Sequence, residues 1–469
     1  MNVFVLIFLV GCLGAVLFSK LSISSVMGCM YLYCLVLFPS SVKVFGFSPS
    51  TIVTYLTLLY ALYQMFVEKK NNSADTLHIV GVFAIFSVAF LFTLPFSASM
   101  SFLNQLTAVK QFLLDLLVPL SLVVLLRKHG ECISIQKFAL ILVLVTCVYG
   151  VYTYAIGTNL YSLLVQIYYP EANDFEKYME EERAGLEGRI GGFIGHPVFY
   201  AGMMMIFFYL VLYFSLQMMK KKNRAWFFFS VVCMLAIAVN LFLTGTRSAM
   251  VAVAVGLAYY CVRVLSYSKL MIIGASIVGV IGVMATFPIF GKYQPMVDSI
   301  VYFWDDDKTS GEIKGSSVSM RLNQLEGTFD IISGPRILFG NGAGWIRKYM
   351  EKNGKHPVLL GFESLLFSGL VQYGVLGFLL MYGGLFGSMV YVNERLNGKR
   401  DDRYLVNAYV LSYVVYAFLT GAYDFSAFLM IYGFLVKSIL CSEKENKLRT
   451  FFLLSIIAKL NKKKCQIAE

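Results

Sequence analysis

Residues 226–244, WFFFSVVCMLAIAVNLFLT, and residues 248–265, SAMVAVAVGLAYYCVRVL, decide the fold class of this chain. Each stretch has close to the ~20 residues, mostly apolar, that a helix needs to cross the hydrocarbon core of a bilayer. A helix suits that environment because it satisfies its own backbone hydrogen bonds. The segment Gly245-Thr-Arg247 between the two stretches predicts a tight turn at one membrane face.

The rest of the chain has the same apolar character. Of its 469 residues, 58% are hydrophobic and 14% are charged, and the mean hydropathy is +0.71. A soluble domain is usually about one-quarter charged. The sequence therefore predicts an all-α, polytopic transmembrane helical bundle of about 12 to 14 spans. The expected spans are residues 2–19, 21–39, 49–67, 77–95, 107–126, 136–156, 193–218, 226–244, 248–265, 269–289, 366–392, 404–422 and 425–441.

Basic residues gather in the short connections between these spans. If the spans alternate in direction, those connections share one face, which the positive-inside rule makes cytoplasmic. Residues 2–19 lack the charged start and cleavage site of a signal peptide, so we expect a retained first helix. The expected organisation is N-terminal helices in 1–156, a first extracytoplasmic loop in 157–192, helices in 193–289, a large extracytoplasmic loop in 290–365, C-terminal helices in 366–441 and a basic cytoplasmic tail in 442–469.

Several function classes are disfavoured by the same features. The net charge of +12 lies in short loops and the tail, without a basic stripe interleaved with aromatics, so we expect no nucleic-acid partner. The nine cysteines are scattered and lack a CxxC pair, which indicates neither disulfides nor a zinc site. The sequence has no Walker A motif, so ATP does not drive the protein directly. We expect no cofactor.

Three arginines lie at the expected outer membrane boundary. Arg247 is in the turn between two spans, Arg189 is in a glycine-rich segment before the span 193–218, and Arg321 begins a stretch whose spacing predicts an amphipathic surface helix. Charge at a membrane boundary is often functional, and the planar fork of arginine suits phosphate oxygens. For Arg247 the alternative is snorkelling to lipid headgroups.

Glu363 is the expected general base. It lies just before the span 366–392, where a carboxylate is costly and its pKa tends to be raised. His356 is the second candidate, and a purely structural pairing of Glu363 with an arginine is the alternative. We expect His196 to cap a helix. The cluster Gly340-Asn-Gly-Ala-Gly344 predicts a turn and is too generic to indicate a phosphate loop.

Taken in order, these segments resemble the O-antigen polymerase and O-antigen ligase superfamily of bacterial membrane glycosyltransferases. Each motif is degenerate, and the ordered set is more specific than any one of them. The resemblance covers about residues 187–392. Its elements are Arg-x-x-Gly and Gly-x-Pro in Arg189–Pro197, the turn Thr246–Ser248, Arg321, the cluster Phe339–Gly342, and a polar residue eleven positions before Gly374.

The resemblance implies a helical membrane glycosyltransferase fold of the C type and a metal-independent reaction. It implies that Arg189 and Arg247 bind the diphosphate of an undecaprenyl-diphosphate-linked oligosaccharide, and it suggests Arg321 as a third contact. Ligases of this family have a histidine eleven residues before the glycine, whereas this chain has Glu363 there and His356 seven residues further upstream. That departure favours a repeat-unit polymerase and favours Glu363 over His356 as the base.

The leading interpretation is thus a polymerase that makes O-antigen, capsule or exopolysaccharide on the outer face of the bacterial cytoplasmic (inner) membrane. The first alternative is a ligase that transfers glycan to lipid A-core or to protein. The second is a transporter or flippase of lipid-linked oligosaccharide, which should line a cavity at the membrane midplane with polar residues. Expected partners are the lipid-linked oligosaccharide, membrane lipids and a chain-length regulator.

Overall fold

The computed structural model describes most of the chain. Described are residues 3–19, 22–39, 41–68, 74–96, 100–169, 189–266, 318–359, 362, 364–396, 400–420, 424–443 and 445. The expected span 269–289, the candidate base Glu363 and the tail from residue 446 lie outside the described residues.

The described residues form a bundle of helices, which confirms the all-α, polytopic class. Eight of the helices are long and apolar enough to cross a membrane. The helices are α1 (Val3–Phe18), α2 (Ile23–Leu37), α3 (Pro49–Phe66), α4 (Ala74–Thr93), η1 (Leu94–Phe96), α5 (Phe102–Leu125), α6 (His129–Ile156), α7 (Leu160–Tyr168), α9 (Pro197–Lys220), α10 (Arg224–Leu243), α11 (Arg247–Val264), α15 (Val318–Ile331), α16 (Arg336–Phe339), α17 (Trp345–Asn353), α18 (Leu365–Phe378), η3 (Leu379–Gly383), α19 (Gly384–Arg395), α20 (Arg400–Leu419) and a last helix, Phe425–Glu443.

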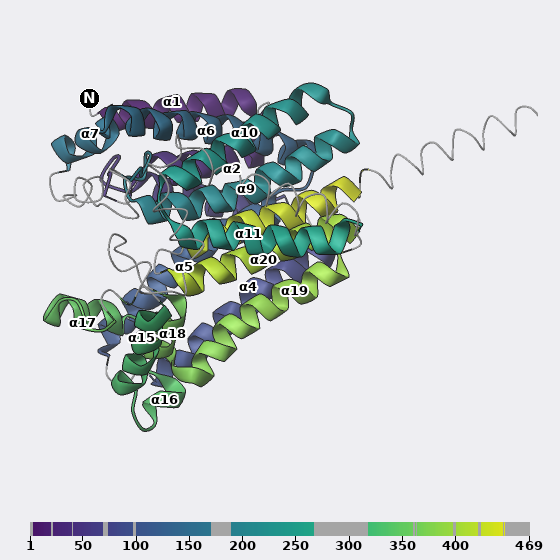
Figure 1. Cartoon of the computed structure of the whole chain (residues 1–469). Coiled ribbons are helices and arrows are strands. Elements are labelled where there is room, and N and C mark those ends of the chain that lie inside the picture. The colour runs from purple at the N-terminus through teal and green to yellow at the C-terminus, as the bar shows by residue number, and fades with distance from the viewer. Residues whose placement is uncertain are drawn as a thin grey trace, which may run out of the picture.

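The long helices lie side by side, and the short helices α15, α16 and α17 gather at one end of the bundle (Figure 1). We call this the loop end; it also holds the α10–α11 turn and α7. The opposite end, which we call the basic end, holds the connections α5–α6, α9–α10 and α19–α20. There Lys221 lies 2.9 Å from the His129 ring and Lys220 forms an ion pair with Asp402 at 2.9 Å. These three basic connections therefore lie at the same end of the bundle, as expected if the helices alternate in direction.

Helix α9 forms the centre of the bundle. It packs against α6, α10, α11 and α20 and is buried along most of its length. A buried polar group needs a hydrogen-bond partner, and Tyr200 of α9 has one, because its hydroxyl donates to Asn240 Oδ1 of α10 at 2.8 Å. On the neighbouring pair, Ser412 of α20 donates to the Ala252 carbonyl of α11 at 2.7 Å. These contacts fix the helices whose loop-end termini form the candidate site.

One expected span has a different structure from the one predicted. The stretch 366–392 is not one continuous α-helix, because it is broken at Gly374, where φ is +65°, and continues through the π-helical turn η3 into α19. Gln372 and several glycines interrupt this stretch, but its mean hydropathy stays high, so hydropathy gave no sign of the break. Two other helices begin earlier than expected: α5 at Phe102 and α6 at His129.

Candidate active site

Arg189 is buried at the loop end and joins two of the sequence motifs. Its side chain is 2% exposed. Nε donates to the Thr244 carbonyl at 2.8 Å and Nη2 donates to Thr246 Oγ1 at 2.9 Å. Between these acceptors Gly245 has a φ of +61°, a conformation that glycine adopts without strain. The turn between α10 and α11 thus wraps around the guanidinium of Arg189.

Arg247 is the first residue of α11 and follows Thr246, the N-cap residue of that helix. Its side chain is half-buried. The N-terminus of a helix carries unpaired N–H groups and the positive end of the helix dipole, which together favour an anion. Arg189, Arg247 and the start of α11 therefore form one positively polarised unit.

Arg321 connects three helices at the same end of the bundle. Nη1 donates to Gln324 Oε1 within α15 at 2.9 Å, and Nη2 donates to the Leu419 carbonyl at the end of α20 at 3.1 Å. The guanidinium also lies over the ring of Phe367 in α18, 5.9 Å from its centroid. A cation at the C-terminus of a helix stabilises the unpaired carbonyls there, so Arg321 holds α15 against α20 and α18.

The last turns of α20 lie between the two arginine sites. Tyr416 is one turn before Leu419, and its hydroxyl donates to the Val198 carbonyl at the start of α9 at 2.6 Å. Arg189 lies close enough to act electrostatically on the Tyr416 hydroxyl. Arg189 and Arg321 are thus linked through about one turn of α20, roughly 5 Å of helix. The structure brings all three predicted arginines to the loop end.

The described neighbours of Glu363 lie at the start of α18, close in sequence to Phe367, the residue whose ring Arg321 covers. Ser364 caps α18, because its Oγ accepts hydrogen bonds from Leu366 N at 2.9 Å and Phe367 N at 3.4 Å. On the other side Phe362 has a φ of +57°, which is rare for a bulky residue and occurs mostly where the surrounding packing enforces it. Strained backbone of this kind gathers at functional sites.

His356 contributes to that packing. Its Nδ1 accepts hydrogen bonds from Val358 N at 3.2 Å and Leu359 N at 3.0 Å, so it closes a turn. Its ring lies 6.0 Å from the ring of Tyr349 and 6.1 Å from that of Phe362. These contacts give His356 a structural role in holding the strained residue before Glu363.

His196 is the N-cap residue of α9. Its Nδ1 accepts a hydrogen bond from Val198 N at 3.2 Å, and Pro197 is the first residue of the helix. Proline suits that position because its missing N–H would have no partner there. The expectation that His196 caps a helix is confirmed.

The glycine cluster after α16 docks onto the break in α18. Asn341 N donates to the Val371 carbonyl at 2.9 Å and Gly342 N donates to the Gln372 carbonyl at 2.8 Å. A helix that breaks at Gly374 leaves carbonyls of the preceding turn without their usual donors. The cluster supplies those donors, so the predicted turn completes a membrane helix.

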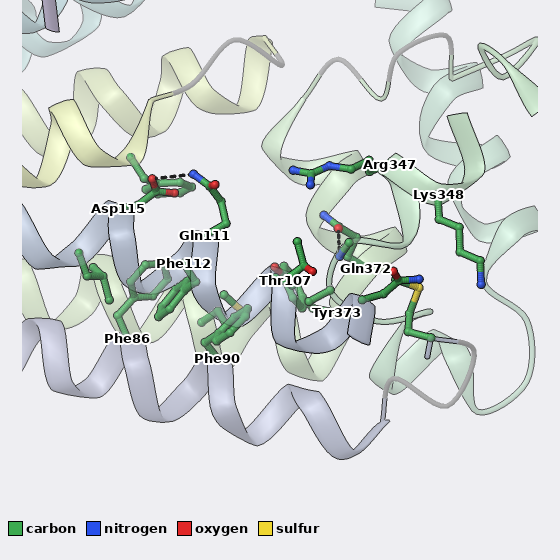
Figure 2. Close-up of a pocket in the computed structure, with 18 of the residues that line it drawn as sticks. Phe86, Phe90, Thr107, Gln111, Phe112, Asp115, Arg347, Lys348, Gln372 and Tyr373 are labelled. Atoms are coloured by element: carbon green, nitrogen blue, oxygen red, sulfur yellow. Dashed lines mark hydrogen bonds between the residues drawn. The ribbon is translucent and has the colours of Figure 1, made fainter. Parts of the chain in front are cut away.

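A cavity of about 620 Å³ lies beside this junction, between α5 and α17 (Figure 2). None of Arg189, Arg247, Arg321 and His356 lines it. Its polar lining comes from α5, α17 and α18, and its aromatic lining from α4, α5, α18, η3 and the last helix. The main residues are Phe86, Phe90, Asn104, Thr107, Gln111, Phe112, Asp115, Gly344, Arg347, Lys348, Glu351, Gln372, Tyr373, Tyr382 and Phe425.

Sequence analysis missed the α5 side of this cavity. Asn104, Thr107, Gln111 and Asp115 recur every three or four residues, which is the spacing of one helix face. A carboxylate within an apolar span is a functional signal by itself, so Asp115 alone could have indicated a functional site on α5. Within the described part of the chain, no three His, Cys, Asp or Glu side chains gather in a way that would hold a metal ion.

Comparison with known proteins identifies the middle of the chain. Residues 232–382 match the family described as O-antigen ligase. The matched region begins within α10 and ends within η3, so it contains the α10–α11 turn, Arg321 and the glycine cluster; Arg189 precedes it. No curated protein matches the chain.

Proposed function

We propose that this integral membrane protein, which residues 232–382 assign to the O-antigen polymerase and ligase superfamily, is a polysaccharide repeat-unit polymerase. The donor is a growing glycan on undecaprenyl diphosphate, and the acceptor is a sugar hydroxyl of another lipid-linked repeat unit. The site faces the outside of the cytoplasmic membrane, and the reaction needs no metal.

The single observation that carries the proposal is the arrangement of Arg189 in the α10–α11 turn. Its Nε and Nη2 are held by Thr244 and Thr246, and Arg247 follows directly in the chain. A leaving diphosphate develops negative charge, and prearranged cations stabilise that charge without a metal. In the proposed role Arg189 fixes the turn and adds positive charge, while Arg247 and Arg321 contact the diphosphate oxygens.

The chemical step is a displacement at the anomeric carbon of the donor. The acceptor oxygen forms the new bond to that carbon, and the bond from the carbon to the diphosphate oxygen breaks. The Glu363 carboxylate takes the proton of the acceptor hydroxyl, and undecaprenyl diphosphate leaves as the anion. Glu363 is the proposed base because Ser364, the next residue, caps α18 one turn before Phe367, and the guanidinium of Arg321 lies over the Phe367 ring.

The family description favours one second candidate. A ligase would use the same donor and the same arginines and would pass the glycan to lipid A-core or to a protein. The two functions differ in the acceptor alone, so analysis of the product separates them.

The test is an assay with the purified full chain and a lipid-linked repeat unit, run without nucleotide and with a chelator present. A ladder of longer glycans on the lipid carrier, lost in Arg247→Ala and Glu363→Gln, is the expected result. A ladder that persists in both variants overturns the proposal. Transfer that appears when lipid A-core or a protein acceptor is added, without a ladder, indicates the ligase.

A further inference from the structure

The side chains that line the cavity between α5 and α17 differ in chemistry from those of the arginine site. The α5 wall carries uncharged hydrogen-bonding groups and one carboxylate at helical spacing, Asn104, Thr107, Gln111 and Asp115. Polar side chains in an apolar span face the protein interior or a water-filled space. In Figure 2 Gln111 and Asp115 lie together at one side of the cavity, and Arg347 lies across from them.

The α5 wall of the cavity carries one acidic residue, Asp115. Gln111 Nε2 donates to Asp115 Oδ1 at 3.1 Å, which leaves the remaining carboxylate acceptor sites for a ligand. Asp424, which caps the last helix by accepting from Ala427 N at 3.0 Å, lies near enough to act electrostatically on Asp115. The α5 wall thus offers amide, hydroxyl and carboxyl groups and no cation. It therefore suits hydroxyl or amide N–H groups better than a diphosphate.

The remaining walls are aromatic. Phe90 and Phe112 stack with ring centroids 4.0 Å apart, and Tyr382 and Phe425 stack at 5.7 Å. Aromatic faces are electron-rich, and a pyranose ring presents a face of C–H groups that packs against them while its hydroxyls point to the polar wall. A lipid tail would cover the polar groups of α5 without pairing them, which costs free energy.

The cavity mouth is held in place by α18. The Gln372 amide oxygen accepts a hydrogen bond from Gly344 N at 2.8 Å, directly before the start of α17. Arg347, one turn further on, is exposed at the mouth. Gln372 follows Phe367, the ring under Arg321, by five residues, or about 7.5 Å of helix. The cavity and the Arg321 site thus lie against two different faces of α18.

We infer that this cavity binds the acceptor saccharide of the reaction, with the Asp115 carboxylate accepting hydrogen bonds from sugar hydroxyls, the Gln111 amide accepting from and donating to them, and the aromatic walls packing against the rings. This assignment rests on the proposed function. The volume of about 620 Å³ falls within the ~300–1,000 Å³ of sites for small molecules. Arg347 at the mouth then lies where an acidic substituent or the carrier diphosphate of the acceptor would enter.

The experiment uses two readouts on the purified full chain. The first is binding of the free repeat-unit oligosaccharide, released by mild acid from the lipid carrier of the host cell, measured by saturation-transfer NMR and calorimetry. The second is the KM for the lipid-linked acceptor in the polymer assay. The variants are Gln111→Leu and Asp115→Leu, with Lys110→Gln as the matched control, since Lys110 neighbours Gln111 on α5 but does not line the cavity.

At least a tenfold loss of oligosaccharide affinity in both cavity variants, with Lys110→Gln unchanged, is the expected result. The acceptor KM should rise by a similar factor while binding of undecaprenyl diphosphate stays the same. Equal oligosaccharide binding in all three variants, or no binding by the wild-type protein, overturns the assignment. A wild-type chain that binds oligosaccharide at this cavity but makes no polymer refutes the proposed function and leaves the saccharide site standing.

Discussion

Gly340 and Gly374 contact each other backbone to backbone, although 34 residues separate them in the sequence. Both have positive φ, +73° and +65°. A Cβ at Gly340 would lie within 3.0 Å of the backbone of Gln372 and Gly374, and a Cβ at Gly374 would lie as close to the backbone of Leu338 and Phe339. Each glycine is therefore required by the backbone that packs against it, and the turn after α16 and the broken helix form one unit.

Alanine at either position should disrupt the packing of the turn after α16 against the broken helix. We expect Gly374→Ala and Gly340→Ala each to lose about 1–3 kcal/mol from backbone strain, and more from the overlap with neighbouring backbone. Thermal unfolding in detergent, followed by fluorescence, measures the loss. Gly387→Ala is the matched control, because Gly387 is within α19 and a Cβ there meets nothing within 4 Å. Equal melting temperatures for the three variants would contradict the contact.

Substitutions in the Arg189 site test the hydrogen-bonding geometry of this arginine separately from its charge. Thr246→Val removes the hydroxyl that accepts from Arg189 Nη2, and loss of a buried hydrogen-bond partner costs about 1–3 kcal/mol. Arg189→Lys keeps the charge but cannot reach both acceptors with the planar fork. We expect both variants to unfold at lower temperature and to lose at least tenfold in polymerisation rate. Wild-type stability and rate in Thr246→Val would mean that the turn does not depend on this contact.

Arg321 offers a test with an internal control. Arg321→Lys loses the fork that contacts Gln324 and the Leu419 carbonyl together, so we expect a reduced polymerisation rate and weaker binding of undecaprenyl diphosphate. Arg336→Lys should have no effect, since Arg336 is exposed on α16, within the same outer region. The readout is titration of the lipid diphosphate into each purified variant. Equal affinities in the two variants would remove Arg321 from the diphosphate site.

His356 should prove replaceable by asparagine. The Oδ1 atom of asparagine can accept the backbone hydrogen bonds that Nδ1 now receives from Val358 and Leu359. We expect His356→Asn to retain most of the activity, and His356→Ala to lose about 1 kcal/mol of stability with the turn. If His356 were the base, His356→Asn would lose the polymerisation activity, because the asparagine amide cannot take up the proton of the acceptor hydroxyl. A polymerisation rate close to that of the wild type is the expected outcome; loss of the activity in a variant that still folds returns His356 to the catalytic step.

The sequence predicted the helical spans well because bilayer thickness and backbone hydrogen bonding leave few alternatives. It predicted the helix starts less well: α6 begins at His129 because Glu131 accepts from the backbone of Arg127 and Lys128 at 3.0 and 3.1 Å, a local contact that hydropathy does not register. The break at Gly374 was missed for another reason. Its donors come from Asn341 and Gly342, and such a long-range pairing has no local pattern.

The candidate site, too, could be predicted from the sequence only in part. Arg189, Arg247 and Arg321 were found as single residues, because a charge at a membrane boundary stands out in an apolar sequence. That Arg189 lies inside the turn preceding Arg247 could not be predicted, since it depends on how α9, α10 and α11 pack. The α5 face was missed because Asn104 and Thr107 are unremarkable one at a time and gain meaning from the cavity that they line.

The union of the glycine cluster with α18 also has a consequence for biosynthesis. A membrane helix with open carbonyls at Val371 and Gln372 is poorly suited to enter lipid alone. Ribosomes make residues 336–344 before residues 365–395, so the donors that close the break already exist when that helix emerges. The segment that closes the break is therefore synthesised before the helix that it completes, and we expect the two to depend on each other for folding.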